Sequence, residues 1–193
     1  MEAELPCSPT PGTHGFGAVV RLSVADILAD SNAWRVPLQT AFDSHCLLYW
    51  KDQVLSPVEE VQLMNLLDWD RTAPPDQLYG PLGKPGVDAD IFRRWRIPDQ
   101  PEVLLQGEGT VTDHCGLSGE ISSGKPVLEW HSDGCYENDT PSRATSMYSI
   151  STKATGGATL FMSGLQIFED LTEEEREIVS RLFVQYSRTP QPM

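Results

Sequence analysis

Short apolar runs alternate along the whole chain with polar stretches rich in Pro and Gly, a pattern that predicts many short elements. Residues 1–14 are polar and are expected to form a disordered leader. A first edge strand is predicted over 15–22, and the apolar run 46–50 predicts a strand of a buried sheet. Between them, residues 24–44 carry apolar side chains at helical intervals, and Pro37 is expected to start or break a helix there.

Two capping boxes mark where further helices begin. Ser56 stands before Pro57 and Glu59, which predicts a helix from residue 57 to about residue 68. Thr172 and Glu175 repeat the pattern and predict a second helix over 173–184. The predicted apolar positions are Val58, Val61, Met64, Leu66 and Leu67 in the first helix and Ile178, Val179, Leu182 and Phe183 in the second.

The middle of the chain gives weaker signals. The irregular stretch 71–90 has two open interpretations, a surface loop or a loop that borders a substrate pocket. Residues 102–107 predict a strand, and 116–125 predict a Gly- and Ser-rich connection. One helical turn is expected over 165–170.

A regular alternation follows in residues 144–150, where polar and apolar side chains would face opposite sides of a strand. A jelly-roll strand has this two-sidedness, with one face toward the cavity. The Gly156–Gly157 pair predicts a turn after it. On the next predicted strand, Thr159, Phe161 and Ser163 would share one face.

Composition narrows the classes of function. The 193 residues suffice for one domain with a core, and 39% apolar content with 15 Pro and 15 Gly favours a loop-rich β or mixed fold. A net charge of −14 argues against nucleic acid and anionic membrane as partners, because both require a basic surface. The one basic cluster, Arg93, Arg94 and Arg96, is expected on a solvated surface. The cysteines are scattered, and neither a charged-then-apolar signal sequence nor a membrane-spanning run is found, so we expect a soluble, cytoplasmic protein with free thiols.

The candidate chemistry lies at His131-Ser132-Asp133. In an extended backbone, side chains at i and i+2 leave the same face, so His131 and Asp133 can reach one point in space. One imidazole and one carboxylate make up two thirds of the 2-His-1-carboxylate set that binds non-haem Fe(II). With 4 His and 28 acidic residues in the chain, this spacing alone is a weak signal, and a loop His beside a solvated Asp is the simpler interpretation.

The order of the surrounding motifs is more specific. W-H-S-D, then an alternating strand, then T-G-G-A-T-L-F-M-S-G resembles the TauD/TfdA (taurine dioxygenase) family of Fe(II)- and 2-oxoglutarate-dependent dioxygenases. The resemblance implies that His131 and Asp133 are iron ligands and that Thr159 binds a carboxylate of 2-oxoglutarate. It also implies a double-stranded β-helix (jelly roll) with flanking helices. The N-terminal block H-C-L-L-Y-W-K-D-Q-V-L-S-P with its two helices is also similar to the family, so residues 15–193 are expected to form roughly its N-terminal two thirds.

The expected reaction follows from the resemblance. Fe(II) would be the cofactor, 2-oxoglutarate and O2 the cosubstrates, and a small organic molecule would be hydroxylated with release of succinate and CO2. The sequence does not identify that substrate, and it leaves the oligomeric state open, a homo-oligomer included.

One departure from the family pattern leads to an alternative function. The distal iron-binding His and the 2-oxoglutarate-binding Arg of the family would lie beyond residue 184, and no His follows His131 in this sequence. We therefore expect a C-terminally truncated dioxygenase, and the alternative is a non-catalytic truncated or regulatory protein that binds a protein partner. His45 and His114, the latter in a predicted loop, are the upstream candidates for a replacement ligand.

Simpler roles are open for several neighbouring residues. Thr159 is an ordinary strand Thr in the simpler interpretation, and Trp130 and Tyr148 are expected in the core more than against a substrate. Cys135 is expected to be a buried bystander thiol. A zinc site is the metal alternative with little support, because adjacent Cys and His rarely bind one ion; its ligands would be His114, Cys115, His131 and Cys135.

Overall fold

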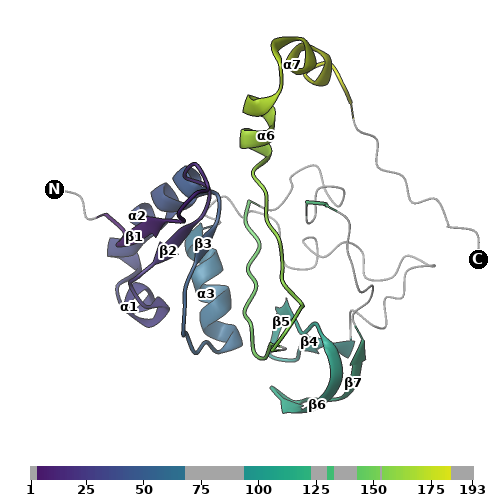
Figure 1. The fold of residues 1–193 in the computed structure, drawn as a ribbon. Coiled ribbons are helices and arrows are strands. Elements are labelled where there is room, and N and C mark those ends of the chain that lie inside the picture. Colours follow the sequence, from purple (N-terminus) through teal and green to yellow (C-terminus); the bar gives the residue numbers. More distant parts are fainter. Residues whose placement is uncertain (1–3, 68–93, 123–129, 133–142, 153, 184–193) are drawn as a thin grey trace, which may run out of the picture. The chain divides into compact units, whose positions relative to one another are not determined.

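The computed structural model describes two units of the chain, and Figure 1 shows their elements. The first unit is 1–150 and the second is 151–193. The residues described are 4–67, 94–122, 130–132, 143–152 and 154–183. The first unit contains β1 (Cys7–Pro9), β2 (Ala18–Val20), α1 (Val24–Ala29), α2 (Ser31–His45), β3 (Leu48–Tyr49), α3 (Pro57–Leu67), β4 (Arg96–Ile97), β5 (Gln100–Leu104), β6 (Glu108–His114) and β7 (Leu117–Ser122). The second contains α6 (Gly164–Asp170) and α7 (Glu173–Val179).

The chain begins with an ordered strand. β1 pairs antiparallel with β2, with Cys7 opposite Val20, and Leu5 just before it is only 6% exposed. The expectation of disorder over residues 1–14 is therefore wrong for residues 5–9. Leu5 lies in the apolar core, and this burial stabilises the strand despite its polar surroundings.

β2 is the central strand of a three-stranded sheet in the order β1-β2-β3. The strand predicted over 15–22 therefore exists, but it does not lie at the edge of the sheet. The strand predicted over 46–50 is confirmed as β3, which is half-buried at the sheet edge. β3 runs parallel to β2. Parallel neighbours need a crossover, which α1 and α2 supply.

Two helices occupy the region where a helical pattern with a break was predicted. Asp30 ends α1 and caps α2, and its side chain accepts a hydrogen bond from the Ala33 N–H. Pro37 lies inside α2 and neither starts nor breaks it, which corrects the prediction. A proline at this position removes one backbone hydrogen bond. The buried Leu38 and Ala41 offset that loss by packing α2 into the core.

The capping box before α3 is confirmed. The Ser56 N–H donates to the Glu59 carboxylate (2.8 Å), and the Glu59 N–H donates to Ser56 Oγ (3.3 Å). Leu66 and Leu67 are buried as predicted, Leu63 is buried although the pattern did not single it out, and Val58 is 45% exposed. The core cluster of the first unit is Leu5, Val20, Val24, Ile27, Leu38, Ala41, Leu63, Leu66 and Leu67.

Two small antiparallel sheets follow. β5 pairs with β4 and confirms the strand expected over 102–107, shifted toward the N-terminus. β6 and β7 form a hairpin. The predicted connection over 116–125 is wrong for Leu117–Ser122, which is strand β7. Gly116 and Gly119 lower the strand propensity of this stretch. The alternation of Leu117, Gly119 and Ile121 nevertheless suits a strand, and it pairs with β6.

The two strands predicted in the second half of the chain are absent from the described ranges. Residues 144–150 and 158–163 carry no assigned strand. The helical turn expected over 165–170 is confirmed as α6, and the Thr172 capping box is confirmed at α7, which ends at Val179 instead of residue 184. The described residues thus form helices and three small sheets, of three, two and two strands. They do not form a complete jelly roll.

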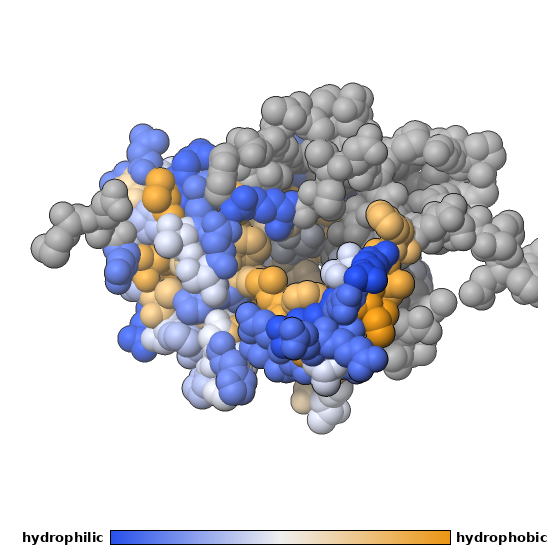
Figure 2. Space-filling view, turned by 90° about the horizontal axis from the view of Figure 1, so that it is seen from above, coloured by the Kyte–Doolittle hydropathy of each residue, from blue (hydrophilic) through white to orange (hydrophobic). Residues whose placement is uncertain are grey.

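Exposed apolar side chains accompany α6 and α7, neither of which buries a residue. The largest apolar side chains exposed in the second unit are Leu160, Phe161, Met162, Leu165, Ile167, Phe168, Ile178, Val179, Leu182 and Phe183. Apolar and polar residues also intermingle on the molecular face drawn in Figure 2. In the parts of the chain that are described, no helix has the length and apolarity needed to cross a membrane.

Candidate metal and cosubstrate site

His131 lies in the first unit on a short segment, 130–132, that is neither helix nor strand. Its side chain is exposed, as is that of Ser132. Trp130 is 61% exposed, so the expectation that it lies in the core is wrong. Asp133 and Cys135, the predicted second ligand and the nearby thiol, lie outside the described residues.

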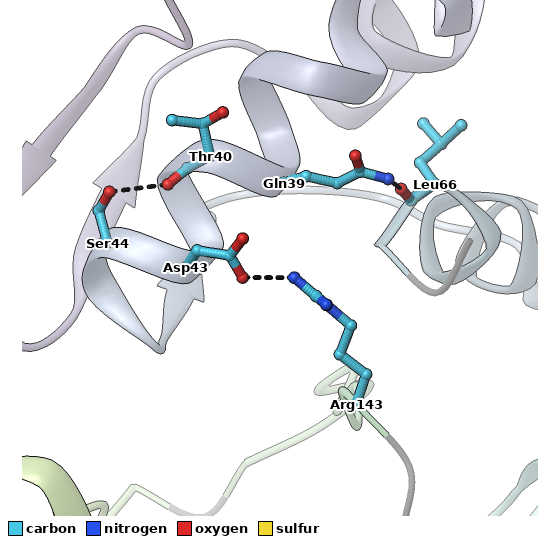
Figure 3. Close-up of polar contacts among 6 residues, drawn as sticks. All are labelled: Gln39, Thr40, Asp43, Ser44, Leu66 and Arg143. Atoms are coloured by element: carbon cyan, nitrogen blue, oxygen red, sulfur yellow. Dashed lines mark hydrogen bonds and ion pairs between the residues drawn. The ribbon is translucent and has the colours of Figure 1, made fainter. Parts of the chain in front are cut away.

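The segment 143–150, ten residues beyond the motif, is held against α2 and α3. Its Arg143 donates to Asp43 Oδ1 of α2 at 2.6 Å across a sequence separation of 100 residues (Figure 3). Ala144 packs against the core cluster. We call residues 143–150 the anchored segment, because side-chain contacts with the helices fix its path in place of a β-ladder.

Two further contacts extend this anchoring along the segment. Ser146 Oγ donates to Glu60 Oε1 of α3 at 2.8 Å, and the Tyr148 hydroxyl donates to the Gln53 carbonyl at 3.4 Å. Tyr148 was expected in the core, and its side chain is half-buried. Residues 95 or 86 positions apart meet here, and no local pattern in the sequence indicates such pairs.

The two helices that contact the anchored segment, α2 and α3, are also hydrogen-bonded to each other. Gln39 of α2 donates from Nε2 to the Leu66 carbonyl near the end of α3 at 2.6 Å (Figure 3). This bond satisfies a carbonyl that the helix leaves without an intrahelical partner. The Arg143 contact therefore rests on a packed helix pair, although both side chains of the ion pair remain partly exposed.

Thr159 lies in the second unit and is exposed, on a stretch without helix or strand. The turn predicted before it is confirmed, since Gly156 and Gly157 have φ of 78° and 74°, a region that glycine enters without strain. The strand predicted after it is wrong. Ser163 caps α6 by accepting from the Gln166 N–H, which ends the extended stretch in favour of a helix.

The upstream histidines have other contacts. His45 Nδ1 lies 2.8 Å from the Gly15 carbonyl oxygen, which ties the end of α2 to the turn before β2. His114 is the last residue of β6 and not part of a loop, which corrects its predicted setting, and its Nε2 lies 3.8 Å from Cys115 Sγ. Within the described ranges, no three His, Cys, Asp or Glu side chains are grouped to hold a metal ion.

Among the residues that the structure describes, two carboxylates have a pKa shifted from its ordinary value, and both cap helices. The pKa of Glu59 is lowered because its carboxylate accepts hydrogen bonds from the backbone N–H and then the hydroxyl of Ser56. The pKa of Glu175 is lowered in the same way by Thr172. These shifts stabilise helix starts and do not indicate catalytic groups.

The model of one family, described as the taurine catabolism dioxygenase TauD, TfdA family, matches residues 8–191. This range contains His131, Asp133 and Thr159. No curated protein and no solved structure matches the chain.

Proposed function

The chain belongs to the TauD/TfdA dioxygenase family, and from this we propose that it is an Fe(II)- and 2-oxoglutarate-dependent dioxygenase acting on a small organic molecule. The observation that carries the proposal is a match over nearly the whole chain, which contains the W-H-S-D and T-G-G-A-T motifs in order. The family model therefore covers the sequence between the motifs as well as the motifs themselves.

In this proposal His131 and Asp133 hold the iron. An imidazole nitrogen and a carboxylate oxygen are donors that suit non-haem Fe(II). His131 is exposed on an irregular segment whose backbone is not committed to a helix, which is compatible with such a role. The bound metal supplies the oxygen chemistry of the reaction. We assign the third ligand to no residue of this chain.

Thr159 is the proposed contact for 2-oxoglutarate. Its hydroxyl can donate a hydrogen bond to a carboxylate of the cosubstrate, a charge-assisted bond stronger than a neutral one. The Gly156–Gly157 turn immediately precedes Thr159, and Thr159 is exposed. Consumption of 2-oxoglutarate and O2 yields succinate and CO2 while the substrate gains a hydroxyl group.

Succinate formation tests this function without knowledge of the prime substrate. With Fe(II), O2 and 2-oxoglutarate, we expect slow succinate release that His131→Ala abolishes. Thr159→Val should raise the KM for 2-oxoglutarate about tenfold, because a hydrogen bond to a charged group is worth about 1.5–3 kcal/mol. Thr155→Val, at the exposed turn before it, is the matched control and should leave the KM unchanged. Equal rates in wild type and His131→Ala would contradict the proposal.

One observation favours the alternative of a non-catalytic protein that binds a protein partner. The second unit exposes ten large apolar side chains, from Leu160 to Phe183, and extended apolar exposure is typical of interaction surfaces. A folded chain that neither binds Fe(II) nor forms succinate would favour this function over the dioxygenase.

A further inference from the structure

Arg21 follows β2 and donates a hydrogen bond to a serine of the neighbouring strand, from its Nη2 to Ser8 Oγ at 2.7 Å. The strand register explains this contact. Ser8 of β1 lies opposite Val19 of β2, so Arg21 occupies the diagonal position on the same face of the sheet. On the other face, Cys7 and Val20 pack into the core. Arg21 and Ser8 therefore face outward, and Arg21 is exposed while Ser8 is half-buried.

The guanidinium of Arg21 contacts a neutral hydroxyl although acidic side chains are abundant. The chain contains 28 acidic residues against 14 Lys and Arg, yet no ion pair between residues that the structure describes includes Arg21. A guanidinium binds phosphate through charge-assisted hydrogen bonds, which are stronger than bonds to a neutral hydroxyl. An anionic group attached to Ser8 Oγ would therefore meet a cation that already points at this oxygen.

Ser8 also has the sequence context of a phosphorylation site. Pro9 follows it, and a serine followed by proline is what proline-directed protein kinases modify. β1 is an edge strand of three residues that is paired on one side, so local opening presents Ser8 in an extended segment to such an enzyme. We propose that Ser8 is a phosphorylation site and that Arg21 binds the phosphate. The proposal is independent of the iron site.

The reaction is a phosphoryl transfer from ATP. Ser8 Oγ attacks the γ-phosphorus, the bond from this phosphorus to the bridging oxygen breaks, and ADP leaves. The hydroxyl proton passes to the catalytic base of the kinase. The product carries nearly two negative charges at neutral pH and oxygens that accept hydrogen bonds from the Arg21 guanidinium. Phosphorylation is therefore expected to hold β1 more firmly on β2.

The chain carries its own comparison at Ser56. This serine is also followed by a proline, Pro57, and it is exposed. It differs from Ser8 in the charge beside its hydroxyl, because Ser56 Oγ donates to the Glu59 carboxylate at 2.7 Å. A phosphate on Ser56 would meet a like charge, which opposes the modified state, whereas a phosphate on Ser8 would meet a guanidinium.

The test treats the full chain with ATP and a purified mitogen-activated protein kinase and locates the phosphate by peptide mass spectrometry. We expect it on Ser8. Hydrogen exchange at the Thr10 amide then measures opening of the strand pair, because this N–H donates to the Gly17 carbonyl at 2.9 Å. Phosphate on Ser8 should slow that exchange about two- to fivefold, the upper part of the range for an exposed ion pair, since phosphate carries nearly two charges.

The slowing should vanish in Arg21→Gln and persist in the control Arg181→Gln, because Arg181 pairs with Glu177 in the second unit. Phosphate on Ser56 and none on Ser8, or no phosphate on either, would overturn the proposed site. Equal exchange at Thr10 in the phosphorylated and unmodified wild-type chains would overturn the role of Arg21. The wild-type comparison requires no variant, so a folding defect in Arg21→Gln does not remove the test.

Discussion

Glu59 and Glu175 each close the first turn of a helix with a carboxylate held by a Ser or Thr. Both caps were predictable because a capping box uses only four consecutive residues. His131, Asp133 and Thr159 are different. Their identity was predictable from motif order, but a metal site requires convergence in space, so their roles remain predictions.

The Glu59 cap makes stability depend on pH. Its pKa is lowered in the folded chain, so the stabilisation is present above the unfolded value of about 4.3 and is lost as pH falls through the lower folded value. We measure the free energy of unfolding by urea titration between about pH 5 and about pH 3, a window that spans the unfolded pKa of a glutamate. It should fall less over this window in Glu59→Gln than in wild type. Glu102→Gln, on β5 outside any cap, is the control. An identical pH dependence in Glu59→Gln and wild type would contradict the capping role.

At the scale of elements, α2 packs into the core of the first unit. Leu38 of α2 is 0% exposed among the core residues. Leu38→Ala should lower the free energy of unfolding by about 2–5 kcal/mol, because it leaves a cavity. Val36→Ala on the same helix, where Val36 is 61% exposed, should change it by less than about 0.5 kcal/mol. Chemical denaturation measures both, and equal losses would show that α2 does not pack as described.

The anchored segment gives a second prediction at this scale. Trypsin binds the side chain of the arginine after which it cleaves, so the contact of Arg143 with Asp43 competes with cleavage at this site. Asp43→Asn should speed this cleavage by a factor of about 1.4 to 5, since an exposed ion pair is worth about 0.2–1 kcal/mol. Asp26→Asn on α1 is the control, because Asp26 contacts Ser23 instead. A cleavage rate at Arg143 that Asp43→Asn does not change would mean that the ion pair does not hold the segment.

Element prediction succeeded where the signal was local and failed where distant residues decide. The α3 start and the turn at Gly156 follow from neighbouring residues. Alternation in 144–150 suggested a strand, but Arg143, Ser146 and Tyr148 contact helices and a loop 86 to 100 positions away. The β6–β7 hairpin lacked a clear local signal, because Cys115 occupies a turn position where Asn, Asp or Gly is usual.

For the whole molecule, the family match identifies the family, whereas the predictions of single elements do not determine how strands pair. The match spans residues 8–191 and shows which family the chain belongs to. The jelly roll that the family implies needs long-range strand pairing, which depends on tertiary contacts more than on local propensity. The described residues show three small sheets instead.

One anaerobic titration tests most directly whether this chain binds Fe(II) through His131 together with 2-oxoglutarate. Addition of 2-oxoglutarate to the chain with Fe(II) should produce the weak visible charge-transfer band of a chelated complex. The band should vanish in His131→Ala and persist in His14→Asn, a control at another exposed histidine whose positive φ of 51° asparagine tolerates. No band in the folded wild-type chain, or an equal band in His131→Ala, would contradict the account.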